Sequence, residues 1–139
     1  MKMRESVEKR RIGVIFTLLS LCSMLLIFEY YKMEHGNNVI LAIEIIPIII
    51  FIASFIITFI KTGLWVFIHK PLKKLDEREI ALTSKSLRFA YSIFTVVVLA
   101  ILLFLAITQT QIDVVLVVSF ILFAHLLPAS YIAWTEKNI

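Results

Sequence analysis

The chain has 139 residues, of which 60% are hydrophobic and 17% are charged, whereas a soluble domain is typically about half apolar and about a quarter charged. A water-soluble domain of this size cannot bury so much apolar surface, so the composition indicates a membrane protein. The formal net charge of +4 does not indicate nucleic-acid binding, because the basic residues are not interleaved with aromatic residues.

Four apolar stretches account for the composition, and each is near the roughly 20 residues that a helix needs to cross a bilayer. They predict an all-α, integral membrane four-helix bundle that forms a single domain over residues 1–139. A transmembrane β-barrel is excluded, because runs such as "VILAIEIIPIIIFIASFIITFI" show no alternation of apolar and polar residues. The predicted helices cover residues 12–31, 39–60 with a continuation to 69 as the alternative, 76–108 with its membrane part at 89–108, and 112–134.

The distribution of basic residues predicts the orientation. If the amino terminus is cytoplasmic, thirteen of the fourteen Lys and Arg residues, from Lys2 to Lys137, lie inside and only Lys32 lies outside. Cytoplasmic loops near the membrane hold Lys and Arg in excess. We therefore expect a multi-pass protein of the cell membrane with both termini in the cytoplasm and with contacts to anionic lipid headgroups.

The connections between the stretches predict two antiparallel hairpins, because "KMEHGNN" and "TQTQI" are both short. The connection between the hairpins is longer and ends at Asp76. This residue is expected to cap a helix, with Glu79 three residues later in the position of a capping box. The third helix would then be roughly 50 Å long at 1.5 Å per residue, and it would enter the membrane near Phe89 after a cytoplasmic first third.

The start of this third helix has an apolar face and a neighbouring basic face at helical spacing. The apolar residues are Ile80, Leu87, Tyr91 and Phe94, and the basic residues are Lys74, Arg78, Lys85 and Arg88. We interpret the basic face as a contact to lipid headgroups, and the alternative is a docking element for a cytoplasmic protein partner.

The segment "LDEREIALTSKSLRFAYSIF" at residues 75–94 resembles a pattern found in several families of small bacterial and archaeal membrane proteins of unknown function. In those families an Asp-Glu-Arg triplet precedes a membrane helix on the cytoplasmic side, and Asp76, Glu77 and Arg78 match it here. The resemblance covers about 20 of the 139 residues. It implies a four-helix membrane architecture and brings no enzymatic activity with it.

Three acidic residues, Glu29, Glu44 and Asp113, lie toward the predicted outer side. A charged group at membrane depth is costly and is therefore a functional hypothesis. Beside Glu44, Pro47 leaves the carbonyl of Ile43 without its helical donor, and such a pair of groups can bind a cation or a proton. The alternative register uses residues 45–68 as the span and leaves Glu44 at the wet outer interface.

His125 is predicted to lie about 19 Å into the fourth helix, where the Ala124 carbonyl freed by Pro128 offers a hydrogen-bond partner. His35 is expected outside and His69 near the inner surface. No second histidine is therefore expected at this depth, and neither haem nor a metal ion is predicted. A packing role for His125 is the first interpretation, and a proton relay is the alternative.

Small and hydroxyl residues share faces on the first two helices. They are Gly13, Thr17 and Ser20 on the first helix, and Ser54 and Thr58 on the second. Such residues permit close helix packing more often than they line a path for ions.

No phosphate-binding loop, paired-cysteine motif or glycine-flanked nucleophile is present, so we predict no enzyme, no catalytic residue, no cofactor and no metal. The first functional hypothesis is a noncatalytic accessory, regulatory or assembly component, which acts through helix packing and its charged helix start. The alternative is a small oligomeric proton or cation transporter that uses Glu44 with Glu29, Asp113 or His125, and a membrane enzyme comes third. The expected partners are the bilayer and either a protein at the cytoplasmic face or further copies of the chain, without nucleic acid.

Overall fold

The computed structural model describes residues 2–33 and 38–136, with side chains from residue 7 onward except that of Leu72. His35 and Lys137 lie outside the described residues. The elements are α1 Lys2–Met33, α2 Asn38–Phe55, the π-helix η1 Ile56–Ile60, α3 Leu64–Ile68, the 3₁₀ turn η2 Leu72–Lys74, α4 Glu77–Thr108 and α5 Val114–Thr135. Four helical segments, namely α1, α2 with η1, α4 and α5, are long and apolar enough to cross a membrane. The prediction of an all-α, multi-pass membrane protein is confirmed.

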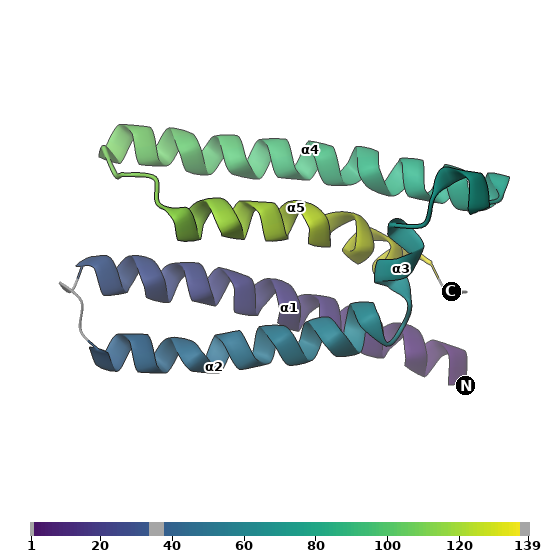
Figure 1. Ribbon diagram of the computed structural model, residues 1–139, viewed down its shortest axis with the longest axis horizontal. Coiled ribbons are helices and arrows are strands. Elements are labelled where there is room, and N and C mark those ends of the chain that lie inside the picture. Colours follow the sequence, from purple (N-terminus) through teal and green to yellow (C-terminus); the bar gives the residue numbers. More distant parts are fainter. Residues whose placement is uncertain (1, 34–37, 137–139) are drawn as a thin grey trace.

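The long helices lie side by side in the order α2, α1, α5, α4 (Figure 1). We call the end of the bundle where α1 and α4 begin and α5 ends the terminal end. The opposite end, where α2 and α5 begin, is the loop end. The short helix α3 lies at the terminal end and contacts α5 and η1 (Figure 1). This order makes α2 and α4 the outer helices of the bundle.

The α1–α2 interface is built from small and hydroxyl residues, as the sequence predicted. Thr17 is fully buried; its hydroxyl donates to the Gly13 carbonyl at 2.8 Å and lies 3.0 Å from Ser54 Oγ. A Cβ atom on Gly13 would overlap Thr58 Oγ1 and would lie 3.1 Å from Thr58 Cβ. The two backbones therefore approach as closely as a glycine allows, which is typical of helix contacts in lipid.

Helix α1 begins well before the predicted residue 12, and this basic extension packs on the end of α5. Arg10 is buried and donates from Nη2 to the Glu136 carbonyl at 3.0 Å. Arg11 donates from Nε and Nη2 to the Trp134 carbonyl at 3.2 and 2.9 Å, and its guanidinium lies 5.2 Å from the centre of the Trp134 ring. The two arginines therefore satisfy carbonyls at the carboxyl end of α5, where a helix favours positive charge.

The alternative that the second helix continues to residue 69 is wrong. The helix ends with η1 at Ile60, and Gly63 adopts a left-handed conformation with φ of 76° before α3 starts. Glycine adopts this conformation without steric cost, so the chain can turn here. The turn directs α3 back onto α5.

The start of α4 confirms the predicted capping box, because Asp76 accepts a hydrogen bond from the Glu79 N–H and the Glu79 carboxylate accepts one from the Asp76 N–H. The buried face of α4, however, is formed by Thr83, Ser86 and Ala90. The apolar face faces outward, with Leu87 50% and Tyr91 73% exposed. Small residues therefore form the buried face at the start of α4, and the predicted apolar face is open to external contacts.

Replacing Gly13 with alanine is expected to lower the free energy of unfolding by about 1–3 kcal/mol, because the new methyl group overlaps the Thr58 side chain. Unfolding of the purified protein by dodecyl sulfate in mixed micelles, followed by circular dichroism, measures this change. The double variant Gly13→Ala, Thr58→Ala is expected to recover most of the loss. Equal stability of Gly13→Ala and the parent would contradict the close approach.

Candidate functional site

Two of the predicted acidic residues meet a lysine at the loop end. Lys32 Nζ lies 2.6 Å from Glu29 Oε1 and 2.5 Å from Asp113 Oδ2. Glu29 and Lys32 are one turn apart on α1, and Asp113 is the N-cap of α5, where its Oδ1 accepts from the Leu116 N–H at 2.8 Å. The cluster joins α1 to α5 and places one cation between two carboxyl groups.

The pKa of Asp113 lies below its ordinary value of 3.8. Burial alone would raise this pKa, but the hydrogen bonds from Lys32 and from backbone N–H groups at the start of α5 stabilise the charged carboxylate more strongly. Asp113 is therefore an ionised structural partner of Lys32 under ordinary conditions.

Glu44 lies apart from this cluster. It is 7% exposed on the face of α2 that also buries Pro47. No described side chain donates a hydrogen bond to its carboxylate. Burying a carboxyl group without a described hydrogen-bond donor costs free energy, so Glu44 is the acidic residue that remains a candidate for an ion or proton site.

The structure corrects the prediction that His125 has no second histidine near it. The rings of His69 and His125 lie 6.5 Å apart between centroids and are parallel to within 6°. Trp65 completes the cluster, with its ring 4.4 Å from that of His69 and 6.5 Å from that of His125. His69 reaches this position because the turn at Gly63 directs α3 onto α5.

Both histidines use the same nitrogen for a local hydrogen bond. His69 Nδ1 donates to the Trp65 carbonyl and His125 Nδ1 donates to the Ile121 carbonyl, each at 2.8 Å. The partner of His125 is therefore Ile121 and not the predicted Ala124. In a neutral ring with this hydrogen bond, Nε2 is the hydrogen-bond acceptor. Both residues are exposed, so His125 is not a residue of the packed core.

The carboxyl groups and histidines do not come together in one centre. Glu29 and Asp113 lie with Lys32, His125 lies with His69, and Glu44 faces α1. Among the described residues, no group of three or more His, Cys, Asp or Glu side chains is arranged to hold a metal ion.

The predicted basic residues of the α4 start are exposed at the terminal end. They are Lys74, Arg78, Lys85 and Arg88. Arg78 pairs with Glu136 at 3.2 Å, although its side chain remains 74% exposed. The neighbouring Lys70 pairs with Glu79 at 2.9 Å. Exposed pairs of this kind contribute little to stability, so most of the basic charge remains available for external contacts.

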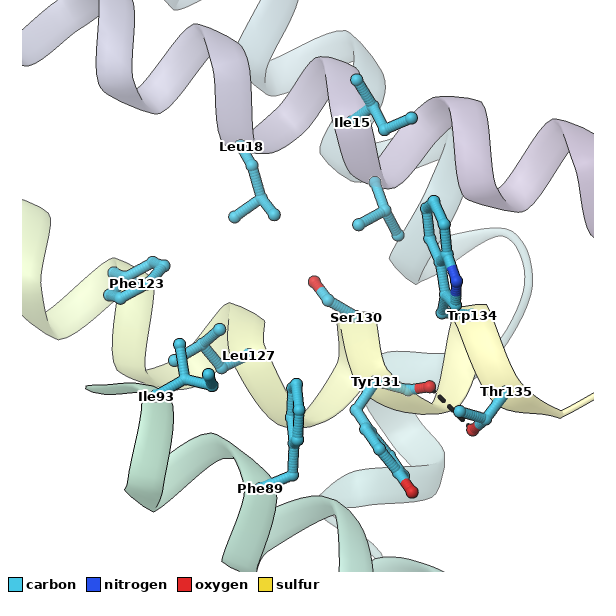
Figure 2. A pocket seen from close by; sticks show the side chains of 11 residues that line it. Ile15, Leu18, Phe89, Ile93, Phe123, Leu127, Ser130, Tyr131, Trp134 and Thr135 are labelled. Carbon is cyan, nitrogen blue, oxygen red and sulfur yellow. Dashed lines mark hydrogen bonds between the residues drawn. The ribbon is translucent and has the colours of Figure 1, made fainter. Parts of the chain in front are cut away.

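A cavity of about 580 Å³ lies between α1, α4 and α5 (Figure 2). Its walls are apolar and aromatic, with Phe89 and Ile93 from α4, Leu18 from α1 and Phe123 and Leu127 from α5. Figure 2 shows the hydroxyl of Ser130 directed into this space. Ser130 is 7% exposed, and its hydroxyl has no hydrogen-bond partner among the described residues.

Sequence reasoning missed the histidine pair and the cavity. The Thr62-Gly63 step, at the end of an apolar stretch, was the available signal for the turn that forms the histidine pair. The cavity has no comparable signal, because its walls come from helices far apart in the sequence.

Lowering the pH is expected to remove the Lys32–Asp113 interaction. Because the pKa of Asp113 is lowered in the folded state, its stabilisation is complete above about pH 4 and is lost as the pH falls through the lowered pKa. Between pH 6 and pH 3, the free energy of unfolding should therefore fall by up to about 1 kcal/mol more in the parent than in the Asp113→Asn variant. The difference is small because the ion pair is partly exposed. Thermal unfolding in neutral detergent measures this difference.

Asp76→Asn is the matched control, because it also alters an N-cap but no ion pair is found at Asp76 among the described residues. The Asp76→Asn variant should show the same pH dependence of stability as the parent. If the Asp113→Asn variant also shows that pH dependence, the Lys32–Asp113 interaction does not contribute to stability.

Comparison with known proteins gave no significant match to a family model, to a curated protein or to a solved structure.

Proposed function

We propose that this membrane protein is a noncatalytic accessory, regulatory or assembly component that acts through lateral helix packing and the charged start of α4. In this proposal the chain forms two antiparallel hairpins in the cell membrane, with both termini and the first third of α4 in the cytoplasm. The resemblance of residues 75–94 to small membrane proteins of unknown function agrees with this architecture.

The observation that carries the proposal is that α4 is exposed in two places, along the apolar surface of its membrane part and at its basic start. Its membrane part contacts mainly α5, and large side chains such as Phe104 and Ile107 are 64% and 82% exposed. Its start presents exposed Arg78, Lys85 and Arg88. A partner can therefore pack along the helix within the membrane and meet positive charge outside it.

The distribution of charge supports the proposed orientation. The described Lys and Arg side chains belong to elements at the terminal end, apart from Lys32 in the loop-end cluster. An excess of basic residues marks the cytoplasmic side of a membrane protein.

Reversing the charge of Arg78, Lys85 and Arg88 to glutamate is expected to reduce recovery of a partner protein at least about tenfold, because positive charge is replaced by repulsion. Recovery is measured by crosslinking in native membranes, purification in mild detergent and quantitative mass spectrometry. Glu136→Gln is the control, since it removes the Arg78–Glu136 pair and keeps the basic surface. Unchanged recovery after charge reversal, or no partner with the parent, would contradict the accessory function.

The alternative function is a small oligomeric proton or cation transporter, and the buried position of Glu44 favours it. The structure does not join Glu44 to Glu29, Asp113 or His125, so this alternative rests on Glu44 with groups from α1 or from another copy. The hydroxyl groups between α1 and α2 already have partners, because those of Thr17, Ser20 and Ser54 each donate to a backbone carbonyl of their own helix. Thr17 also contacts Ser54 across the interface. This arrangement favours helix packing over a path for ions.

For a transporter, Glu44→Gln is expected to abolish proton or cation flux into proteoliposomes, because the amide cannot exchange a proton or neutralise a cation. Glu29→Gln should keep most of the flux, since Glu29 is partly exposed beside Lys32. Flux is measured with a pH-sensitive dye and with cation-selective dyes under an imposed potential. Equal flux in the Glu44→Gln variant and the parent, or no flux in the parent, excludes this alternative.

A further inference from the structure

The cavity between α1, α4 and α5 has the length of one leaflet of a bilayer. Its lining runs along α5 from Phe123 to Thr135, which is about 18 Å at 1.5 Å per residue. The hydrocarbon of one leaflet is about 15 Å thick, half of the roughly 30 Å of the whole core. Its volume of about 580 Å³ lies within the range of ordinary ligand sites.

Two small hydroxyl residues of α5, Ser130 and Thr135, interrupt the largely apolar lining. The Thr135 hydroxyl donates to the Tyr131 carbonyl at 2.8 Å, whereas the Ser130 hydroxyl has no partner among the described residues. Ser130 is buried, and its hydroxyl points into the cavity (Figure 2). In the same helix, the hydroxyl of Ser119 donates to the Val115 carbonyl at 2.8 Å. Leaving a buried hydroxyl unpaired costs free energy, so an acceptor is expected to enter the cavity from outside the chain.

The terminal end of the cavity carries a cation. Trp134 lines the cavity, and the Arg11 guanidinium lies 5.2 Å from the centre of its ring. Arg11 uses Nε and Nη2 on the Trp134 carbonyl, which is neutral, and no ion pair of Arg11 is found in the described part of the chain. Its positive charge is therefore not balanced by a carboxylate. Tryptophan typically marks the membrane interface, which places this arginine at the level of lipid headgroups.

We propose that this cavity is a binding site for one anionic phospholipid of the surrounding leaflet. An acyl chain occupies the space between Leu18, Ile93, Phe123 and Leu127, and the Ser130 hydroxyl donates to an ester carbonyl of the lipid. The phosphate lies at Arg11, where the guanidinium offers charge and its remaining N–H groups. Ser130 precedes Trp134 by about one turn of α5, so the ester group and the headgroup follow one another along the helix in the order that a phospholipid requires.

The experiment uses the purified full-length chain and native mass spectrometry from neutral detergent. The probes are dioleoylphosphatidylglycerol, dioleoylphosphatidylcholine and oleyl alcohol, which separate an anionic phospholipid from a zwitterionic one and from a chain without an ester or phosphate. We expect one phosphatidylglycerol per chain to bind most tightly. Ser130→Ala should weaken its binding about three- to tenfold, as expected for the loss of one hydrogen bond.

Arg11→Gln should remove the preference for phosphatidylglycerol over phosphatidylcholine, because the phosphate loses its cation. The matched controls are Ser119→Ala and Lys61→Gln, which change a buried serine and an exposed basic residue that do not line the cavity. Both should bind phosphatidylglycerol like the parent. Circular dichroism and size-exclusion chromatography establish that each variant is folded.

Three outcomes would overturn the proposal. The first is no lipid retained by the parent, and the second is equal effects of Ser130→Ala and Ser119→Ala. The third is a dimer that forms without bound lipid and is disrupted by Ile93→Trp, which would show that another copy of the chain fills the cavity.

Discussion

The helices of this protein must hold together in a solvent that is as apolar as their own side chains, and the rest of the structure depends on this constraint. Large aliphatic residues gain nothing by leaving lipid for a protein interior. Close backbone approach and hydrogen bonds must therefore supply the attraction. At the α1–α2 contact Gly13 provides the close approach and Thr17 the hydrogen bonds. The buried face of α4 also consists of small residues, namely Thr83, Ser86 and Ala90.

The same solvent explains why charged residues gather at the helix ends. Backbone groups left free at a helix terminus need partners, and side chains supply several of them here. Asp76 and Asp113 cap the starts of α4 and α5, while Arg10 and Arg11 bind carbonyls at the end of α5. Arg10 and Arg11 belong to the basic residues that the sequence places at the lipid headgroups, and in the structure they also join α1 to α5.

Local features were predictable, and features that depend on a single turn were not. The capping box at Asp76 and Glu79 involves residues three positions apart, so the residue types were sufficient to predict it. The position of His69 depended on whether the chain continues straight after Ile60 or turns at Gly63. A straight continuation would carry His69 away from His125, whereas the observed turn brings the two rings within 6.5 Å of each other. The transporter alternative combined Glu44 with Glu29, Asp113 or His125, whereas in the structure Lys32 pairs with Glu29 and Asp113.

The sequence by itself determined that the chain has four apolar helices, where α4 begins, and at which helix ends the basic residues gather. These properties depend on composition and on hydrogen bonds between near neighbours. Only the tertiary structure decided the order α2, α1, α5, α4, the pairing of Lys32 with Glu29 and Asp113, the histidine pair, and the cavity whose Ser130 hydroxyl has no partner among the described residues. Each of these depends on contacts between distant positions, such as Lys32 and Asp113, which are separated by 81 residues. In lipid many apolar faces are equally acceptable as outer surfaces, so hydrophobic pattern alone does not select which helices become neighbours.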